Sequence, residues 1–328
     1  MFWESLHSDT SDSFDKPKSG RIAVKVINDM GDEVMKVYGR EIMSTDTRLD
    51  QPAPLKQSRR SWWQGTYKGT IYRHAQGEIV RDDALHCLES LRDSCADIVF
   101  LDPPFNLGKR YGKNGSRHDR KKESEYLEYM EKVIARSAVV LKEGGALYLY
   151  HIPKWAIRLS PYLEQHLDFR HWIAISMKNG FVRGDYLYPA HYALLYYTKG
   201  KPAVFNRPKV PKPICARCKK ELRDYGGYKD YVVDGINLSD VWDDVSPVRH
   251  RRTKTRTANE LPLVIPERGI TISGRSGGLV VDPFAGSGTT IVAALAAGMQ
   301  FVAADCQTEY CDLMHGRVSE FSSGKGSR

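Results

Sequence analysis

The sequence predicts an α/β fold with a doubly wound, mostly parallel sheet, and three observations support this. From about residue 70 to residue 316, stretches with helical apolar spacing alternate with short apolar runs. Two of these runs end in an acid followed by proline, at Asp102-Pro103-Pro104-Phe105 and at Asp282-Pro283-Phe284. The second continues into a glycine-rich turn and a run of small residues typical of a strand-to-helix junction.

Length and charge restrict the class of protein. The chain has 328 residues, enough for one large α/β domain and a smaller module. Lys and Arg outnumber Asp and Glu by 49 to 40, which suits a polyanionic partner, although a solvated basic surface is the alternative. The first residues lack the pattern of a secretory signal, and no apolar run reaches the length of a membrane span. We therefore expect a cytoplasmic protein.

The first two thirds of the chain divide into an extension and half of the α/β domain. Residues 1–65 are polar and weakly patterned, and we interpret them as an N-terminal extension that is partly disordered. Residues 66–200 show regular apolar patterns. Strands are expected near residues 71–73, 78–81, 98–101, 146–150, 172–177 and 192–197. Helices are expected near residues 85–91 and 127–141, and a third begins near residue 154.

The stretch Asp102-Pro103-Pro104-Phe105 lies at the mouth of a predicted buried strand. Its carboxylate accepts hydrogen bonds, its prolines stiffen the turn, and its aromatic ring offers a flat stacking face. These properties suit a site that holds a planar group carrying an amine. An ordinary proline turn after a strand is the alternative.

Positive charge is concentrated in two places. The loop 106–122, beside the acid, predicts a basic flap over an anionic ligand, with a solvated loop as the alternative. Residues 201–256 are rich in proline and read as a small inserted module whose basic end suits phosphate contacts. The side chains that we expect to contact the anion are Lys109, Arg110, Lys113, Arg249, Arg251, Arg252 and Lys254.

The same insert contains two cysteines, Cys215 and Cys218, with the Cys-x-x-Cys spacing of half a zinc site. No second close pair and no nearby Cys/His partner follows in the sequence. We therefore predict no metal, with a structural zinc as the alternative.

Residues 257–316 contain the second informative stretch. A helix is expected near residues 261–272, a strand near 278–281, a helix near 291–297 and a strand near 301–304. That last strand ends in Asp305, 19 residues after Gly286, a spacing that suits a carboxylate binding ribose hydroxyls. The glycines lack the third member of a dinucleotide fingerprint, and no phosphate-loop lysine is present. A nucleoside without phosphates, such as S-adenosylmethionine, fits this pattern. Residues 317–328 are predicted to be a flexible C-terminal tail.

Together, the two acid-proline stretches resemble the catalytic and cofactor motifs of amino-methyltransferases that modify exocyclic nitrogens of DNA bases. The catalytic motif comes first, 180 residues before the cofactor motif, which is the order of the permuted β class. The resemblance implies a Rossmann-like class I methyltransferase fold that uses S-adenosylmethionine, with target recognition in the insert at 201–256. It covers roughly residues 70–316.

The resemblance also implies roles for individual residues. Asp102, Pro103, Pro104 and Phe105 would be catalytic, and Asp305 would bind the cofactor's ribose. Asp83 matches the acid that meets the cofactor's adenine amino group. The positions expected at the methionine end are Asp282, Phe284, Gly286, Gly288 and Thr289. Asn259-Glu260-Leu261-Pro262 stands where many members have Gln-Lys-Pro. The segment departs from that motif but keeps Pro262, and Asn259 and Pro262 are expected to bind the cofactor.

The expected substrate is a base flipped out of double-stranded DNA. Asp at the first catalytic position is commoner in the N6-adenine enzymes of the family, whereas N4-cytosine enzymes commonly carry Ser. We therefore expect N6-adenine methylation, with N4-cytosine methylation as the alternative. An inactive DNA-binding relative, and methylation of RNA or of a protein amide, are further alternatives. The family also allows a homodimer and a cognate restriction endonuclease as partners.

Overall fold

The structure is a computed structural model and falls into two units, residues 1–60 and residues 61–328. It describes residues 21–27, 33–39, 62–67, 69–107, 110–111, 117–118, 121–176, 185, 187, 189–212, 214–215, 217–218, 235–245 and 260–322. In the first unit, β1 (Arg21–Ile27) pairs antiparallel with β2 (Glu33–Gly39). These two strands were not expected within the N-terminal extension.

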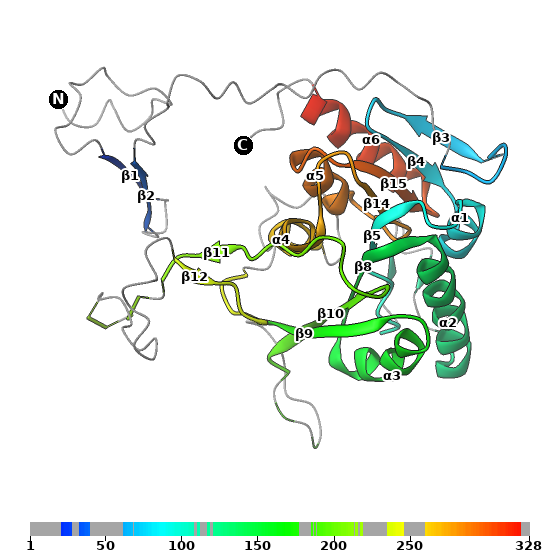
Figure 1. Cartoon of the computed structure of the whole chain (residues 1–328), viewed down its shortest axis with the longest axis horizontal. Helices are drawn as coiled ribbons and strands as arrows, with labels where there is room; N and C mark the ends of the chain where they lie inside the picture. The colour runs from blue at the N-terminus through cyan, green and yellow to red at the C-terminus, as the bar shows by residue number, and fades with distance from the viewer. Residues whose placement is uncertain are drawn as a thin grey trace. The chain divides into compact units, whose positions relative to one another are not determined.

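The second unit is built on a nine-stranded sheet with the order β13-β9-β10-β8-β5-β14-β15-β4-β3. All of these strands except β13 are labelled in Figure 1. The strands are β3 (Thr70–Arg73), β4 (Gly77–Arg81), β5 (Ala96–Leu101), β8 (Leu141–His151), β9 (Asp168–Ser176), β10 (His191–Thr198), β13 (Val241–Trp242), β14 (Leu279–Asp282) and β15 (Gln300–Asp305). Five neighbouring pairs are parallel, and β10 runs antiparallel to both of its neighbours. The mostly parallel sheet expected from the sequence is confirmed.

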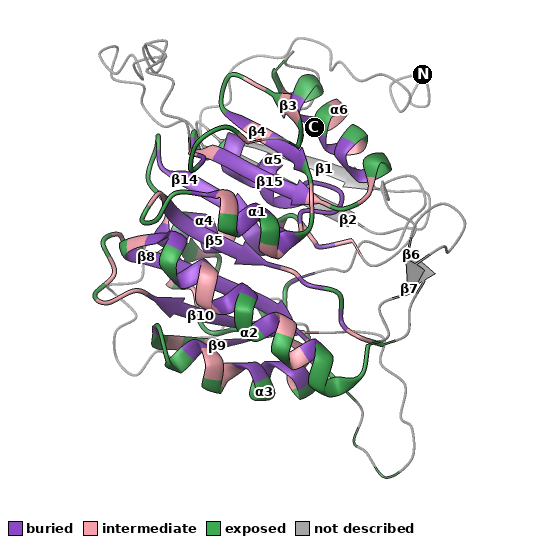
Figure 2. Ribbon diagram, turned by 90° about the vertical axis from the view of Figure 1, so that its right-hand side faces the viewer, coloured by how far each residue is buried: buried purple, intermediate pink, exposed green. Residues whose placement is uncertain are grey.

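Helices cover both faces of this sheet, and Figure 2 shows α1, α2 and α3 in front of the strands, with buried, intermediate and exposed residues along each of them. One face carries α1 (Ala84–Ser90), α2 (Glu123–Val140) and α3 (Pro153–Glu164). The other carries α4 (Val264–Ser273), α5 (Thr289–Ala296) and α6 (Thr308–Ser322). The doubly wound α/β fold is therefore confirmed.

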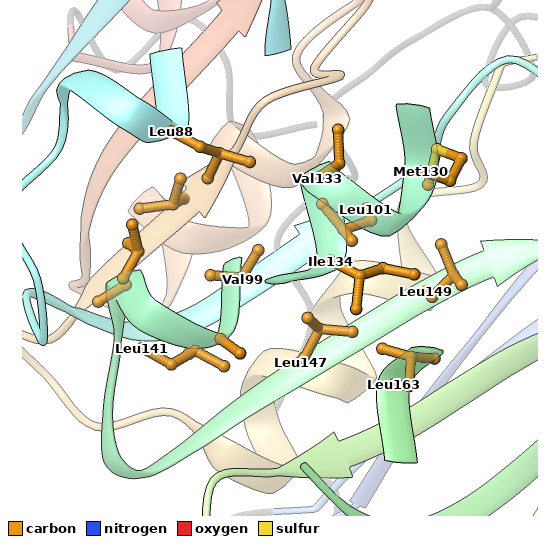
Figure 3. Packing of buried hydrophobic residues seen from close by; sticks show 14 of the residues in the cluster. Leu88, Val99, Leu101, Met130, Val133, Ile134, Leu141, Leu147, Leu149 and Leu163 are labelled. Carbon is orange, nitrogen blue, oxygen red and sulfur yellow. The ribbon is translucent and has the colours of Figure 1, made fainter. Parts of the chain in front are cut away.

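Alternating side chains of β5 pack into the two hydrophobic cores, one on each face of the sheet. Val99 and Leu101 pack with α2 residues such as Ile134 (Figure 3), whereas Ile98 and Phe100 belong to the cluster on the opposite face. All six residues of β5 are buried, as expected for a central parallel strand. The strand is therefore fixed from both sides, and the turn after it starts from a rigid position.

The connections leave β5 and β14 in opposite directions. From β14 the chain passes through α5 to β15 on one side, and from β5 it passes through α2 to β8 on the other. In open α/β sheets, the crevice outside the carboxyl ends of two such strands is the usual ligand site. The two acid-proline stretches both lie at this switch point.

The C-terminal tail, the insert and the basic loop differ from the sequence expectation. Helix α6 continues to Ser322, so residues 317–322 of the predicted flexible tail are helical, and Val318 is buried against the core. In the insert, β13 adds to the edge of the main sheet beside β9, and the two-residue strands β11 (Lys209–Val210) and β12 (Ile236–Asn237) pair with each other. The two-residue strands β6 (Arg110–Tyr111) and β7 (Arg117–His118) pair with each other in the basic loop. Across the described ranges, no helix combines the length and the apolar character needed to cross a bilayer.

Candidate active site

Four neighbouring strands each deliver a carboxylate to one edge of the sheet. Asp305 and Asp282 are the last residues of β15 and β14, and Asp102 directly follows β5. Asp83 follows β4, which pairs with β15 in parallel register. Because all four strands run in the same direction, their carboxyl ends meet at one edge, and acids 222 residues apart in sequence share it.

The glycine turn after β14 forms a backbone cradle. Asp282 is 3% exposed, and its Oδ1 accepts the Phe284 N–H at 2.9 Å. Gly286 and Gly288 have φ of 51° and 80°, a left-handed conformation that favours glycine. Gly288 also precedes Thr289, the first residue of α5, and caps the helix without a side chain. The first amides of α5 are therefore not covered by a capping side chain, which suits a ligand approaching the backbone.

A residue outside the predicted motifs holds this turn in place. Arg317 of α6 donates from Nη1 to the carbonyl of Ser287 at 2.8 Å, and the same nitrogen lies 3.7 Å from Oε1 of Glu260. Burial lowers the pKa of Arg317. Arg317 thus joins α6, the glycine turn and the segment that leads into Pro262. This residue lies in the segment that was expected to be a flexible tail, although Cys311, Met314 and Val318 repeat at helical spacing.

The carboxylates of Asp83 and Asp305 each accept a hydrogen bond from a backbone N–H two residues further along the chain. Asp83 caps α1 by accepting the Leu85 N–H at 2.9 Å, and it also accepts the Tyr129 hydroxyl at 3.1 Å. Burial, reinforced by the Asp83 charge, raises the pKa of Tyr129, so that hydroxyl remains a donor. Asp305 accepts the Gln307 N–H at 2.8 Å. These bonds orient both carboxylates at the sheet edge.

The predicted catalytic turn lies against the aromatic ends of β8 and β10. Asp102 is half-buried and Pro104 is exposed, whereas Pro103 and Phe105 are buried. Burial and the Asp102 charge raise the pKa values of Tyr150 and Tyr192, which keeps both phenols protonated beside the acid.

Phe105, the expected stacking face, is 6% exposed. Its ring stacks on His151 with centroids 4.8 Å apart and an interplanar angle of 27°. Tyr192 and Tyr150 lie at centroid distances of 5.8 and 5.9 Å. Much of the ring is therefore already covered by protein.

Asn106, which follows the turn, closes the base of the basic loop. It has a φ of 53°, which asparagine tolerates better than most residues. Its Oδ1 accepts the Lys121 N–H at 2.7 Å, and its Nδ2 donates to the Lys121 carbonyl at 3.2 Å. The two ends of the loop are therefore joined beside the predicted catalytic turn.

Most of the predicted phosphate contacts cannot be placed in the site. Lys109, Lys113, Arg249, Arg251, Arg252 and Lys254 lie outside the described residues, as does Asn259, and Arg110 is described only as backbone in β6. The described part of the chain contains no cluster of three or more His, Cys, Asp or Glu side chains suited to a metal ion. Cys215 and Cys218 are free thiols, and backbone N–H groups of Cys218 and Arg217 lower the pKa of Cys215.

Comparison with protein families places the chain among known sequences. Residues 96–315 match the family N6_N4_Mtase, described as DNA methylase. The Type II methyltransferase M.BamHI of Bacillus amyloliquefaciens is 43% identical over 228 residues, which are 69% of this chain and 53% of that protein. The chain thus spans about half the length of that relative.

Two further relatives are matched over more of their own length. The Type II methyltransferase M.HpaI of Haemophilus parainfluenzae is 27% identical, over 74% of this chain and 75% of its own. The DNA adenine methyltransferase YhdJ of Escherichia coli is 26% identical, over 71% of this chain and 79% of its own.

Solved structures show the same fold. The cytosine-N4-specific PvuII DNA methyltransferase aligns with a TM-score of 0.57 at 15% identity, over 76% of this chain and 89% of that chain. The complex of M1.HpyAVI with SAM aligns with a TM-score of 0.50 at 20% identity, over 74% and 98% of the two chains. These likenesses confirm the Rossmann-like arrangement of the sheet.

Replacing Gly288 by alanine should destabilise the protein by about 1–2 kcal/mol, because a left-handed φ of 80° costs a residue with a Cβ roughly that amount. The new Cβ would also lie 2.8 Å from Cγ of Met314. Urea unfolding measures the effect. Gly316→Ala in α6 is the matched control, because its Cβ would meet nothing within 4 Å and should leave stability equal or higher. Equal stabilities for the two variants would contradict the prediction.

Stability should fall as the pH drops from about 6.5 towards 3, in part because of His151. Burial lowers the pKa of His151 from 6.5 to about 3, so in this range the unfolded chain binds a proton that the folded protein does not. Between pH 7.5 and 4.5, the wild type should lose about 3 kcal/mol more unfolding free energy than His151→Gln, which has no titrating group there. Denaturant titrations at both pH values test this, and equal losses would contradict it.

Proposed function

Because the chain belongs to the N6_N4_Mtase family of DNA methylases, we propose that it transfers a methyl group from S-adenosylmethionine to an exocyclic amino group of a base in double-stranded DNA. One observation carries the proposal. Asp102 directly follows β5 and Asp282 ends its parallel neighbour β14, so the proposed amine acceptor and the glycine turn proposed to hold the nucleoside lie at the same edge of the sheet, at its switch point.

The residues at this edge fit the cofactor. The backbone at Gly286 and Gly288 lets a ligand approach closely, and the uncapped start of α5 suits a carboxylate such as that of the methionine moiety. Asp305 would bind the ribose hydroxyls, and Asp83 the adenine amino group. The other positions proposed to line the site are Asp282, Phe284, Thr289, Asn259 and Pro262. When bound, S-adenosylmethionine supplies a methyl group activated on a sulfonium.

The catalytic turn would activate the base amine. The lone pair of an exocyclic amine is delocalised into the ring, which makes the amine a poor nucleophile. Asp102 and the carbonyl of Pro103 would accept its two hydrogens, which favours the pyramidal form and aims the lone pair at the methyl group. Phe105 would contact the flipped base, with the rest of its ring held by the aromatic cluster.

Adenine N6 is the target that we propose, on the basis of Asp102. The adenine methyltransferase YhdJ among the relatives supports this choice. Cytosine N4 is the second candidate, because its amine has the same planar geometry and would meet the same two acceptors. The proposal requires duplex DNA as a partner. The basic side chains of loop 106–122 and of residues 249–256, cytoplasmic placement, a homodimer and a partner endonuclease stay predictions.

The function is tested by incubating the purified protein with S-adenosylmethionine and unmethylated duplex DNA, followed by mass spectrometry of the nucleosides. N6-methyladenine is the expected product, and N4-methylcytosine alone would reassign the base. RNA and protein are offered as methyl acceptors in parallel. Absence of any methylated nucleoside from DNA would refute the proposed function.

Replacing Asp102 by alanine should reduce methylation by at least about 100-fold, since positioned acid–base groups contribute roughly 10²–10⁴-fold. Binding of S-adenosylmethionine, measured by calorimetry, should change little because Asp102 is assigned to the amine. Asp168→Ala is the control, since that aspartate is an exposed acid at the start of β9, with 63% of its side chain accessible, and should leave the rate unchanged. Full methylation activity in Asp102→Ala would contradict the proposed mechanism.

A further inference from the structure

A buried chain of hydrogen bonds connects the catalytic turn to the end of β8. The Tyr126 hydroxyl of α2 donates to the carbonyl of Pro104 at 2.9 Å. The same oxygen lies 2.7 Å from Nε2 of His151, the last residue of β8. On the other side of the imidazole ring, Nδ1 accepts the N–H of Ile152 at 2.8 Å.

These contacts determine which atom donates in each of the three hydrogen bonds. Nδ1 of His151 accepts a hydrogen bond, so the ring proton is on Nε2. The Nε2–H then donates to the Tyr126 oxygen, which leaves the tyrosine's own hydrogen for the Pro104 carbonyl. A protonated imidazole would carry hydrogen on Nδ1 and lose the Ile152 bond. The chain is therefore complete only with a neutral His151, and burial lowers the pKa of that ring to about 3.

The chain is shielded from water and holds the turn in two ways. His151 is fully buried and Tyr126 is 3% exposed. Tyr126 fixes the carbonyl of Pro104, while the ring of His151 stacks against Phe105, the next residue of the same turn. Trp155 of α3 packs against the Tyr126 ring, with centroids 4.8 Å apart. Three helix and strand ends thus converge on Pro104 and Phe105.

We infer that Tyr126 and His151 are positioning residues for methyl transfer, which hold the Pro103-Pro104-Phe105 backbone in the orientation that the amine requires. The inference rests on the proposed function. With the Pro104 carbonyl fixed by Tyr126, the preceding Pro103 carbonyl has little freedom to reorient, because consecutive peptide planes share the Pro104 Cα and proline restricts φ, which leaves ψ of Pro104 as the one soft dihedral between them. Neither residue needs to touch the base. Small displacements of a reacting group are expensive, with about 1 Å costing on the order of 10²-fold in rate.

The test is Tyr126→Phe, which keeps the ring packing and removes only the hydroxyl. We expect the single-turnover rate of methyl transfer to DNA to fall about 10- to 100-fold, while the affinity for S-adenosylmethionine stays within about twofold. Tyr197→Phe is the matched control. Its hydroxyl donates to Glu164 at 3.4 Å, its ring is equally buried, and it lies at the far end of β10. It should lose stability without losing rate.

A rate for Tyr126→Phe equal to that of Tyr197→Phe would overturn the inference, because general destabilisation would then explain any loss. Nitrogen-15 NMR of the imidazole rings gives a second readout that does not depend on activity. We expect His151 to be neutral with its proton on Nε2 from pH 7 to pH 5, and its Nε2 resonance to shift in Tyr126→Phe. A proton on Nδ1 would overturn the inference. If the wild type methylates no DNA, the proposed function fails, and the NMR result still decides whether the chain of hydrogen bonds exists.

Discussion

The parallel register of β4, β15, β14 and β5 is the constraint on which the site depends. Parallel strands present their carboxyl ends at one edge, and each of these four ends in or near an aspartate. Backbone N–H groups at the turns donate hydrogen bonds to these carboxylates, as the bond from Phe284 to Asp282 shows. The hydrophobic cores on both faces hold the strands rigid. The backbone positions of the four aspartates are therefore fixed by the sheet.

Local sequence predicted the strands of the main sheet except β13, all the helices except α6, and both motifs, because each has a short-range signal. The buried strands are continuous apolar runs, and the motifs combine acid, proline and glycine at fixed spacing. Strand β8 shows where this fails. It begins at Leu141, which was expected to end the helix near residues 127–141, because Leu141 pairs with Ala96 and because Lys142 reaches Asp97 at 2.6 Å. Such pairing partners lie 45 residues away and leave no local trace.

The residues that support the site were harder to predict than those that form it. Arg317 looks like one more charge near the end of a basic chain, and only the packing of α6 shows that it reaches the glycine turn. Tyr126 and His151 belong to separate elements whose apolar patterns give no reason to connect them. Their meeting depends on how α2 crosses the end of β8, which is a property of the whole domain. The side chains predicted to contact phosphate are basic residues, for which apolar periodicity carries no signal, and most of them lie outside the described residues.

The bonds from Asn106 to Lys121 separate the geometry of the acid-proline turn from the loop between them. A loop whose two ends are joined at its base can change in length or composition with little strain on its anchor, since the entropic cost of closing a loop grows slowly with length. The sequence of the basic loop could therefore change in evolution without disturbing the acid-proline turn to which it is attached.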